Sequence, residues 1–93
     1  AALSNLRANF ALSSKDYARA EQYAARGIAL EQDFEDSYWT LVTVAIDQNQ
    51  HEKVVQTLQQ IETVFGYEFV ADDFDNDFYR QFYQSDAMRV WLQ

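Results

Sequence analysis

The chain has 93 residues, of which 48% are hydrophobic and 16% aromatic, and its net charge is −8. This length suits one domain, residues 1–93, and the hydrophobic content argues against an intrinsically disordered chain. The absence of cysteine excludes a disulfide framework and a thiol nucleophile, while two glycines and no proline favour helices over an all-β fold.

The charge balance also bears on the class of partner. Fifteen acidic residues stand against seven basic ones. Such a surface repels phosphate backbones and anionic lipid headgroups, so we expect no nucleic-acid or membrane binding and favour a basic protein partner. No apolar run approaches the ~20 residues that a membrane-spanning helix needs.

The first half of the chain predicts two helices. The first covers residues 2–12, where Leu3, Leu6 and Phe10 recur at helical spacing. Ser13 is expected to cap a second helix over residues 15–31, with an acidic residue three positions on. The apolar stripe of this second helix contains Tyr17, Ala20, Tyr23, Ala24, Gly27 and Ile28. Its small side chains predict that another helix approaches closely.

The middle of the chain predicts a second pair of helices. The third helix covers residues 36–48, and Asn49 is expected to cap a fourth that ends before Gly66. The apolar positions of the third helix are Tyr38, Leu41, Val42, Ala45 and Ile46. Those of the fourth are Val54, Val55, Leu58, Ile61, Val64 and Phe65.

The last segment, residues 67–93, mixes aromatic residues with weak helix formers. A short fifth helix is expected to start near Asp75, and Ser85 is expected to cap a sixth. The fifth would carry Phe78, Phe82 and Tyr83, and the sixth would turn Met88, Trp91 and Leu92 inward.

Comparing the chain with itself reveals a period of 34 residues. Ala20 aligns with Val54, Ala24 with Leu58, and Gly27 with Ile61. Each member of a pair lies in a second helix that follows a short polar turn. A helix–turn–helix period of about 34 residues is typical of tetratricopeptide repeats.

Two stretches resemble that family. Residues 15–20, KDYARA, resemble its turn and second-helix start, and residues 49–51, NQH, resemble the turn of a second repeat. The resemblance implies an all-α, TPR-like superhelix of antiparallel helix hairpins, with repeats at about 2–33 and 34–66. Residues 67–93 would form short capping helices that cover the last repeat, using Phe69, Phe74, Phe78, Phe82 and Trp91. The repeats are degenerate, since both lack the terminal proline.

The resemblance also implies a binding site. In tetratricopeptide arrays the first helix of each hairpin lines a concave groove that holds a peptide or helix of a partner. The matching positions are Ser4, Asn5, Ala8, Ala11, Trp39, Thr43, Ile46 and Asp47. Trp39 is either a hot spot for binding or a packed side chain, and we weigh the two alike. The Lys and Asn clamp of the chaperone-binding members is absent.

No pattern favours catalysis, a cofactor or a metal. Asp73, Asp75 and Asp77 alternate as in a calcium loop, but Phe78 and Gln84 replace the glycine and glutamate that the loop needs. His51, the only histidine, falls in a turn. We therefore expect a protein that is not an enzyme.

A second interpretation is structural. The chain starts with Ala and not Met. Under this interpretation, the apolar side chains of Leu3 and Leu6 are exposed at the start of the first helix. The segment would then be the C-terminal part of a longer repeat protein or enzyme, and would dock onto the remainder of its parent chain.

Overall fold

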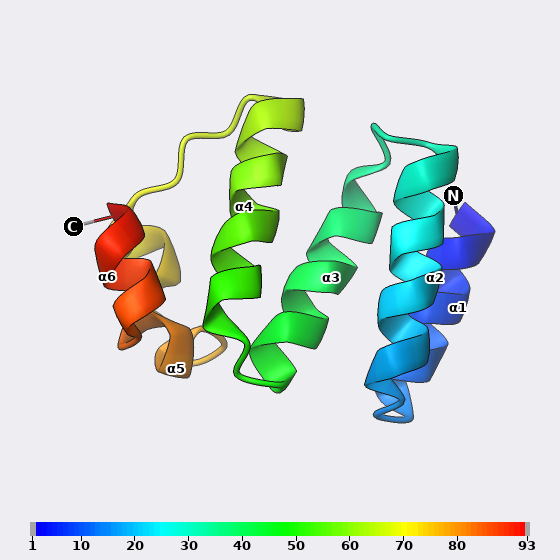
Figure 1. Cartoon of the computed structure of the whole chain (residues 1–93), viewed down its shortest axis with the longest axis horizontal. Coiled ribbons are helices and arrows are strands. Elements are labelled where there is room, and N and C mark those ends of the chain that lie inside the picture. The colour runs from blue at the N-terminus through cyan, green and yellow to red at the C-terminus, as the bar shows by residue number, and fades with distance from the viewer. Residues whose placement is uncertain (1, 93) are drawn as a thin grey trace. The chain divides into compact units, whose positions relative to one another are not determined.

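The computed structural model describes residues 2–92, which form helices joined by short turns and contain no strand (Figure 1). The elements are α1 (Ala2–Ser13), α2 (Tyr17–Leu30), α3 (Glu35–Asp47), α4 (His51–Phe65), the 3₁₀-helix η1 (Ala71–Phe74), α5 (Arg80–Tyr83) and α6 (Asp86–Leu92). The helices pack mainly as sequential antiparallel pairs, which confirms the all-α class. None of the described helices is both long and apolar enough to cross a membrane.

The chain divides within α3 into two compact units. Unit 1 is Ala1–Val44 and unit 2 is Ala45–Gln93. Unit 1 holds α1, α2 and most of α3. Unit 2 holds the last turn of α3 and every element after it.

Small side chains fill the contact between α1 and α2 in unit 1. The helices α1 and α2 run antiparallel, side by side (Figure 1). Ala8, Ala20 and Ala24 have no exposed surface, and Gly27 is buried. Because these residues have short side chains or none, the two backbones can approach closely, as the sequence predicts. Val44 of α3 packs with Ala11 and Ala20 in one buried cluster.

The turns before α2 and α4 have the same geometry. Lys15 and Asn49 both adopt left-handed backbone, with φ of 59° and 54°. The N–H of Asp16 donates to the carbonyl of Ala11 at 2.8 Å, and that of Gln50 donates to the carbonyl of Ala45 at 2.9 Å. Each of these hydrogen bonds joins an N–H to the carbonyl five positions earlier in the chain. Together with the left-handed residue, this bond defines a Schellman motif, which ends one helix before the next begins.

The turns correct two predicted caps. Ser13 is the last residue of α1, and Asp16 is the N-cap of α2, its side chain accepting from the N–H of Arg19. The N-cap of α4 is Gln50, because Asn49 is the left-handed residue of the turn. Ser13 thus lies in α1, and Asn49 lies in the turn that follows α3, so neither residue is the N-cap of the next helix.

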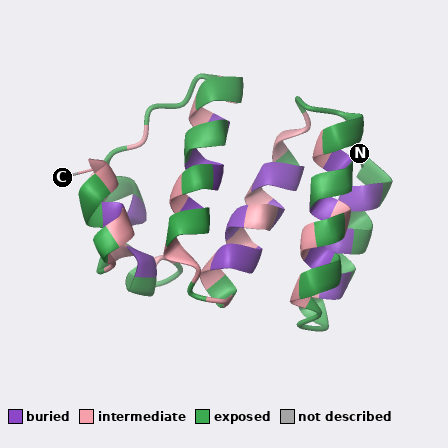
Figure 2. Cartoon of the chain, in the orientation of Figure 1, coloured by how far each residue is buried: buried purple, intermediate pink, exposed green. Residues whose placement is uncertain are grey.

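Unit 2 has an interior of large apolar side chains. The helices α4 and α6 contact each other, and Figure 2 shows buried positions recurring along α4. The side chains with almost no exposed surface are Leu58, Ile61, Phe74, Phe82 and Met88. Phe74 meets the ring of Phe82 edge-on at 5.4 Å between centroids. Burial near these rings raises the pKa of Tyr79.

The last segment confirms some predictions and corrects others. Gly66 ends α4 with a left-handed φ of 78°, and the Oγ of Ser85 accepts from the N–H of Met88 at the start of α6. The fifth helix starts at Arg80 and not near Asp75, because turns and η1 occupy the acidic stretch. Phe78, expected to help cover the last repeat, is half exposed.

Candidate protein-binding face

The apolar stripe of α1 faces solvent. Leu3, Leu6 and Phe10 are 59%, 66% and 76% exposed. The sequence predicts these positions as an apolar stripe, and in a globular helix such a stripe normally faces the core. The burial of the opposite, small-residue face of α1 reverses that arrangement. Three large apolar side chains on one helix face are therefore open to a partner.

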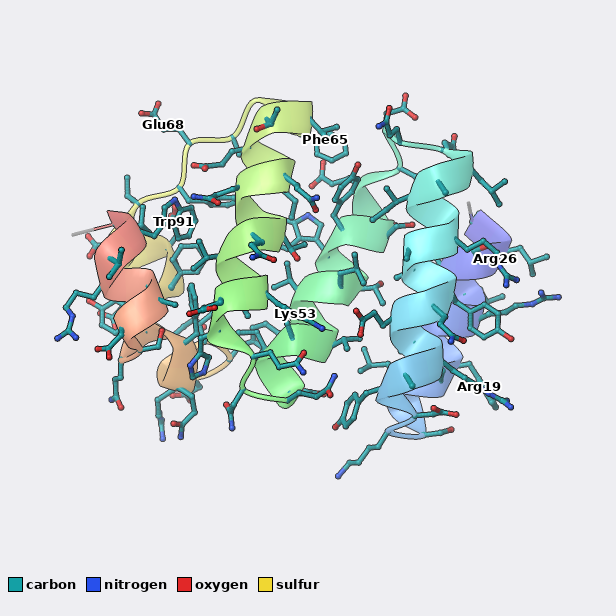
Figure 3. All side chains as sticks on the ribbon, viewed as in Figure 1. Arg19, Arg26, Lys53, Phe65, Glu68 and Trp91 are labelled. Atoms are coloured by element: carbon teal, nitrogen blue, oxygen red, sulfur yellow. The ribbon has the colours of Figure 1, made fainter. Side chains whose placement is uncertain are left out.

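The neighbouring stripe of α2 is basic and aromatic. Arg19, Tyr23 and Arg26 follow one another at spacings of four and three, so they share one helix face. The guanidinium carbon of Arg26 lies 5.7 Å from the centroid of the Tyr23 ring, which is a cation–π contact. Figure 3 shows Arg19 and Arg26 extending from the same side of α2.

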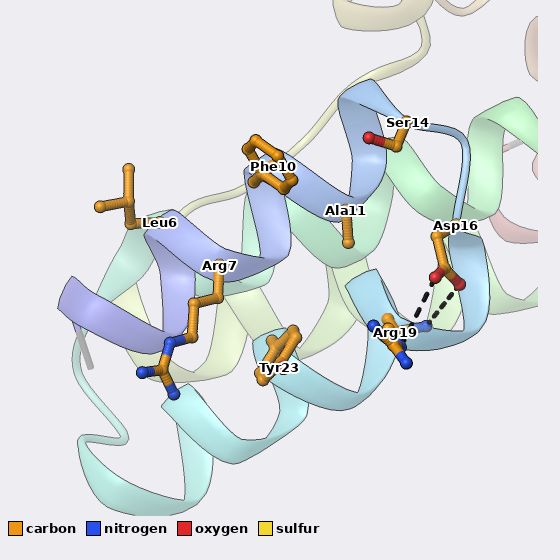
Figure 4. Close-up of a pocket in the computed structure, with 8 residues that line it drawn as sticks. All are labelled: Leu6, Arg7, Phe10, Ala11, Ser14, Asp16, Arg19 and Tyr23. Carbon is orange, nitrogen blue, oxygen red and sulfur yellow. Dashed lines mark hydrogen bonds and ion pairs between the residues drawn. The ribbon is translucent and has the colours of Figure 1, made fainter.

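These two stripes meet in a surface hollow of about 520 Å³. Its lining residues are Leu6, Arg7, Phe10, Ala11, Ser14, Asp16, Arg19 and Tyr23, all of unit 1 (Figure 4). Figure 4 shows Leu6 and Phe10 projecting from α1, with Tyr23 between Arg7 and Arg19 in this view. We call this surface the α1–α2 face and define it by Leu3, Leu6, Arg7, Phe10, Arg19, Tyr23 and Arg26.

The charge of the α1–α2 face is opposite to that of the whole chain. It carries three arginines, and the one carboxylate in the hollow is that of Asp16, whose Oδ2 lies 3.6 Å from the Nε of Arg19. Arg7 makes no ion pair or side-chain hydrogen bond with the described residues. The face is thus locally cationic on a chain whose net charge is −8.

The four groove residues expected from the first repeat are buried. Ser4, Asn5, Ala8 and Ala11 form the inner face of α1. The Oδ1 of Asn5 accepts a hydrogen bond from the Thr40 hydroxyl at 2.9 Å, so this polar side chain has a partner inside unit 1. These residues contact the protein's own helices and do not form an open surface in this structure.

The expected groove residues of the second repeat are more accessible. Trp39 is half-buried, and its indole N–H donates to the Oε2 of Glu35 at 2.8 Å. Thr43 is half-buried, and its hydroxyl donates to the carbonyl of Trp39. In unit 2, Ile46 is half-buried and Asp47 is exposed. Trp39 therefore keeps part of its ring available while its polar atom is satisfied.

The acidic segment of unit 2 uses its carboxylates locally. Asp73 accepts from the N–H of Val70 at 2.9 Å, and Asp77 accepts from the guanidinium of Arg80 at 2.6 Å. Across residues 2–92, no group of three or more His, Cys, Asp or Glu side chains is placed to hold a metal ion. The Nε2 of His51 is buried against Phe82 and has no hydrogen-bond partner in the described part of the chain.

Sequence reasoning missed the residues that make the α1–α2 face distinctive. The apolar periodicity places Tyr23 in the stripe of its helix, and it assigns no role to Arg7, Arg19 or Arg26. The available signal was the spacing of Arg19, Tyr23 and Arg26, which places an aromatic side chain between two cations on one face. Comparisons with protein-family models, with curated proteins and with solved structures found no match.

Proposed function

We propose that this chain is a protein-interaction module that binds a helix or peptide of a partner protein, on a scaffold of two degenerate tetratricopeptide-like repeats. The scaffold proposal is supported by the two matching Schellman turns at residues 15 and 49, 34 positions apart. It is also supported by burial at the equivalent positions of α2 and α4, such as Ala20 and Val54.

One observation carries the binding proposal: Leu3, Leu6 and Phe10 are exposed on a single face of α1. Burying a large apolar side chain contributes about 1.5–3 kcal/mol, so a partner that covers these three side chains gains substantial free energy. Contiguous exposed apolar side chains rimmed by polar ones are characteristic of interaction sites. We therefore place the principal binding site on the α1–α2 face.

Trp39 is a second proposed contact. Its half-buried indole, held at one end by Glu35, gives a partner a large and rigid apolar surface. Tryptophan is enriched among residues that dominate binding energy. This contact belongs to the concave-groove mode of binding, which the tetratricopeptide resemblance implies.

A display library of helical peptides, selected against the 93-residue chain, tests the proposal. Selected peptides should lose at least about tenfold in affinity on the Leu6→Gln, Phe10→Gln double variant, because two buried contacts are removed. The matched control is Phe78→Gln with Val90→Gln, which removes two exposed apolar side chains from unit 2. Binders that respond to Trp39→Ala alone would identify the groove as the site, and binders that respond to neither would contradict the proposal.

The alternative is that the same face docks onto the remainder of a longer parent chain. Exposed Leu3 and Leu6 fit that role equally well. Analytical ultracentrifugation of the isolated chain, together with the peptide selection, distinguishes binding of a separate partner from docking onto the parent chain. A monomer for which no peptide binder is found favours docking onto the parent chain.

A further inference from the structure

The charged side chains of the α1–α2 face indicate which charge a partner should have. We propose that the face binds an amphipathic helix whose apolar stripe is flanked by acidic side chains. This inference rests on the proposed function, because it names the chemistry of the partner at the same site. The partner that we propose is therefore opposite in charge to the basic one that the net charge of the whole chain favours.

The geometry favours a helix as the occupant. The apolar residues of α1 occur at positions 3, 6 and 10, and the basic and aromatic residues of α2 at positions 19, 23 and 26, so the two stripes run along an antiparallel hairpin. Seven residues of helix span about 10 Å at 1.5 Å per residue. A partner helix of about three turns would contact both stripes along their whole length, as a third helix packs on a pair.

The electrostatics favour acidic flanks. Arg7 of α1 lines the hollow together with Leu6 and Phe10, and Arg26 of α2 lies over the ring of Tyr23, which also lines it. Neither arginine makes an ion pair with described residues. Arginine forms bidentate hydrogen bonds with carboxylates, and its guanidinium stays charged at every physiological pH. A helix with glutamates beside its apolar stripe would place carboxylates near both arginines, whereas lysines there would be repelled.

Three synthetic peptides test this inference. All share one leucine stripe over about four turns and differ only in the flanking residues, which are glutamate, glutamine or lysine. Anisotropy titrations of the folded 93-residue chain are performed at about 0.02 M and about 0.5 M salt, where screening differs strongly. At low salt we expect the glutamate peptide to bind at least about tenfold more tightly than the lysine peptide, with a smaller difference at high salt.

Charge-reversal variants locate the effect. Arg7→Glu with Arg26→Glu should weaken binding of the glutamate peptide about tenfold or more and leave the glutamine peptide within about twofold. The control, Arg80→Glu with Arg89→Glu, makes the same change in net charge on unit 2 and should leave the ranking of the peptides intact. Circular dichroism confirms that each variant is folded.

The outcomes separate this inference from the proposed function. If all three peptides bind alike and lose affinity only on Leu6→Gln with Phe10→Gln, the acidic partner is wrong and the apolar site stands. Tighter binding of the lysine peptide also overturns the inference. If no peptide binds but the chain alone forms dimers that Phe10→Gln dissociates, the occupant is a second copy. If no peptide binds and the display selection fails as well, both proposals are wrong.

Discussion

Unit 1 and unit 2 are both helical, but the contact between α1 and α2 in unit 1 is built from smaller side chains than the interior of unit 2. Unit 1 buries Ala8, Ala20 and Ala24, whereas unit 2 buries Leu58, Phe74 and Phe82. Conversely, large apolar residues of α1 face solvent in unit 1. A contact of small residues, as between α1 and α2, lets helices approach closely but removes less apolar surface from water. The larger hydrophobic side chains of α1 then remain on the outside, available for binding.

The largest effect that tests this difference comes from truncating a phenylalanine in each unit. Phe82→Ala should lower the free energy of unfolding by about 3–5 kcal/mol, because the ring is 1% exposed and its removal leaves a cavity. Phe10→Ala should change it by less than about 0.5 kcal/mol, because that ring is already in solvent. Urea unfolding followed by circular dichroism measures both, and equal losses would contradict the assignment of the two rings.

Enlarging a small buried residue tests the interior of unit 1. Ala20→Leu should destabilise the protein by about 1–3 kcal/mol, because Ala20 has no exposed surface and packs against Ala11 and Val44. The control is Ala25→Leu on the exposed side of α2, which should lie within about 0.5 kcal/mol of the parent. If Ala20→Leu proves neutral or stabilising, the helices of unit 1 are not closely packed at this position.

The smallest expected effect concerns the two matching turns. Lys15→Gly should stabilise the protein by up to about 1 kcal/mol, because glycine adopts a φ of 59° without the strain that a lysine side chain causes. Asn49→Gly should gain less, since asparagine tolerates left-handed backbone better than lysine does. Thermal unfolding of both variants, with Lys15→Ala as a control for the lost charge, decides whether the turns are energetically equivalent.

The second helices were the most predictable part of the fold. The aligned pairs such as Ala24 and Leu58 are buried, because a strong apolar stripe in α2 and α4 can satisfy the hydrophobic effect in only one orientation. The helix bounds were also close to the predicted ones. What the periodicity could not give was the cap residue, because one polar turn both ends a helix and starts the next.

The first helix was harder to predict for a physical reason. Its two faces compete: one carries Leu3, Leu6 and Phe10, and the other carries small residues and Asn5. Hydrophobicity alone favours burying the first face. The structure buries the second, where close helix packing and the hydrogen bond from Thr40 to Asn5 provide the compensation. The latter bond joins residues 35 positions apart, so no local pattern in the sequence reveals it.

Each unit contains one of the two tryptophans, so intrinsic tryptophan fluorescence can report on the unfolding of each unit. Trp39 lies in unit 1 beside Glu35, and Trp91 lies in unit 2 with its ring 5.9 Å from that of Phe74. Replacing either indole by phenylalanine leaves an emission signal from one unit only. If the two signals change at the same denaturant concentration, the two units unfold in one cooperative transition. If they change at different concentrations, the units unfold one after the other.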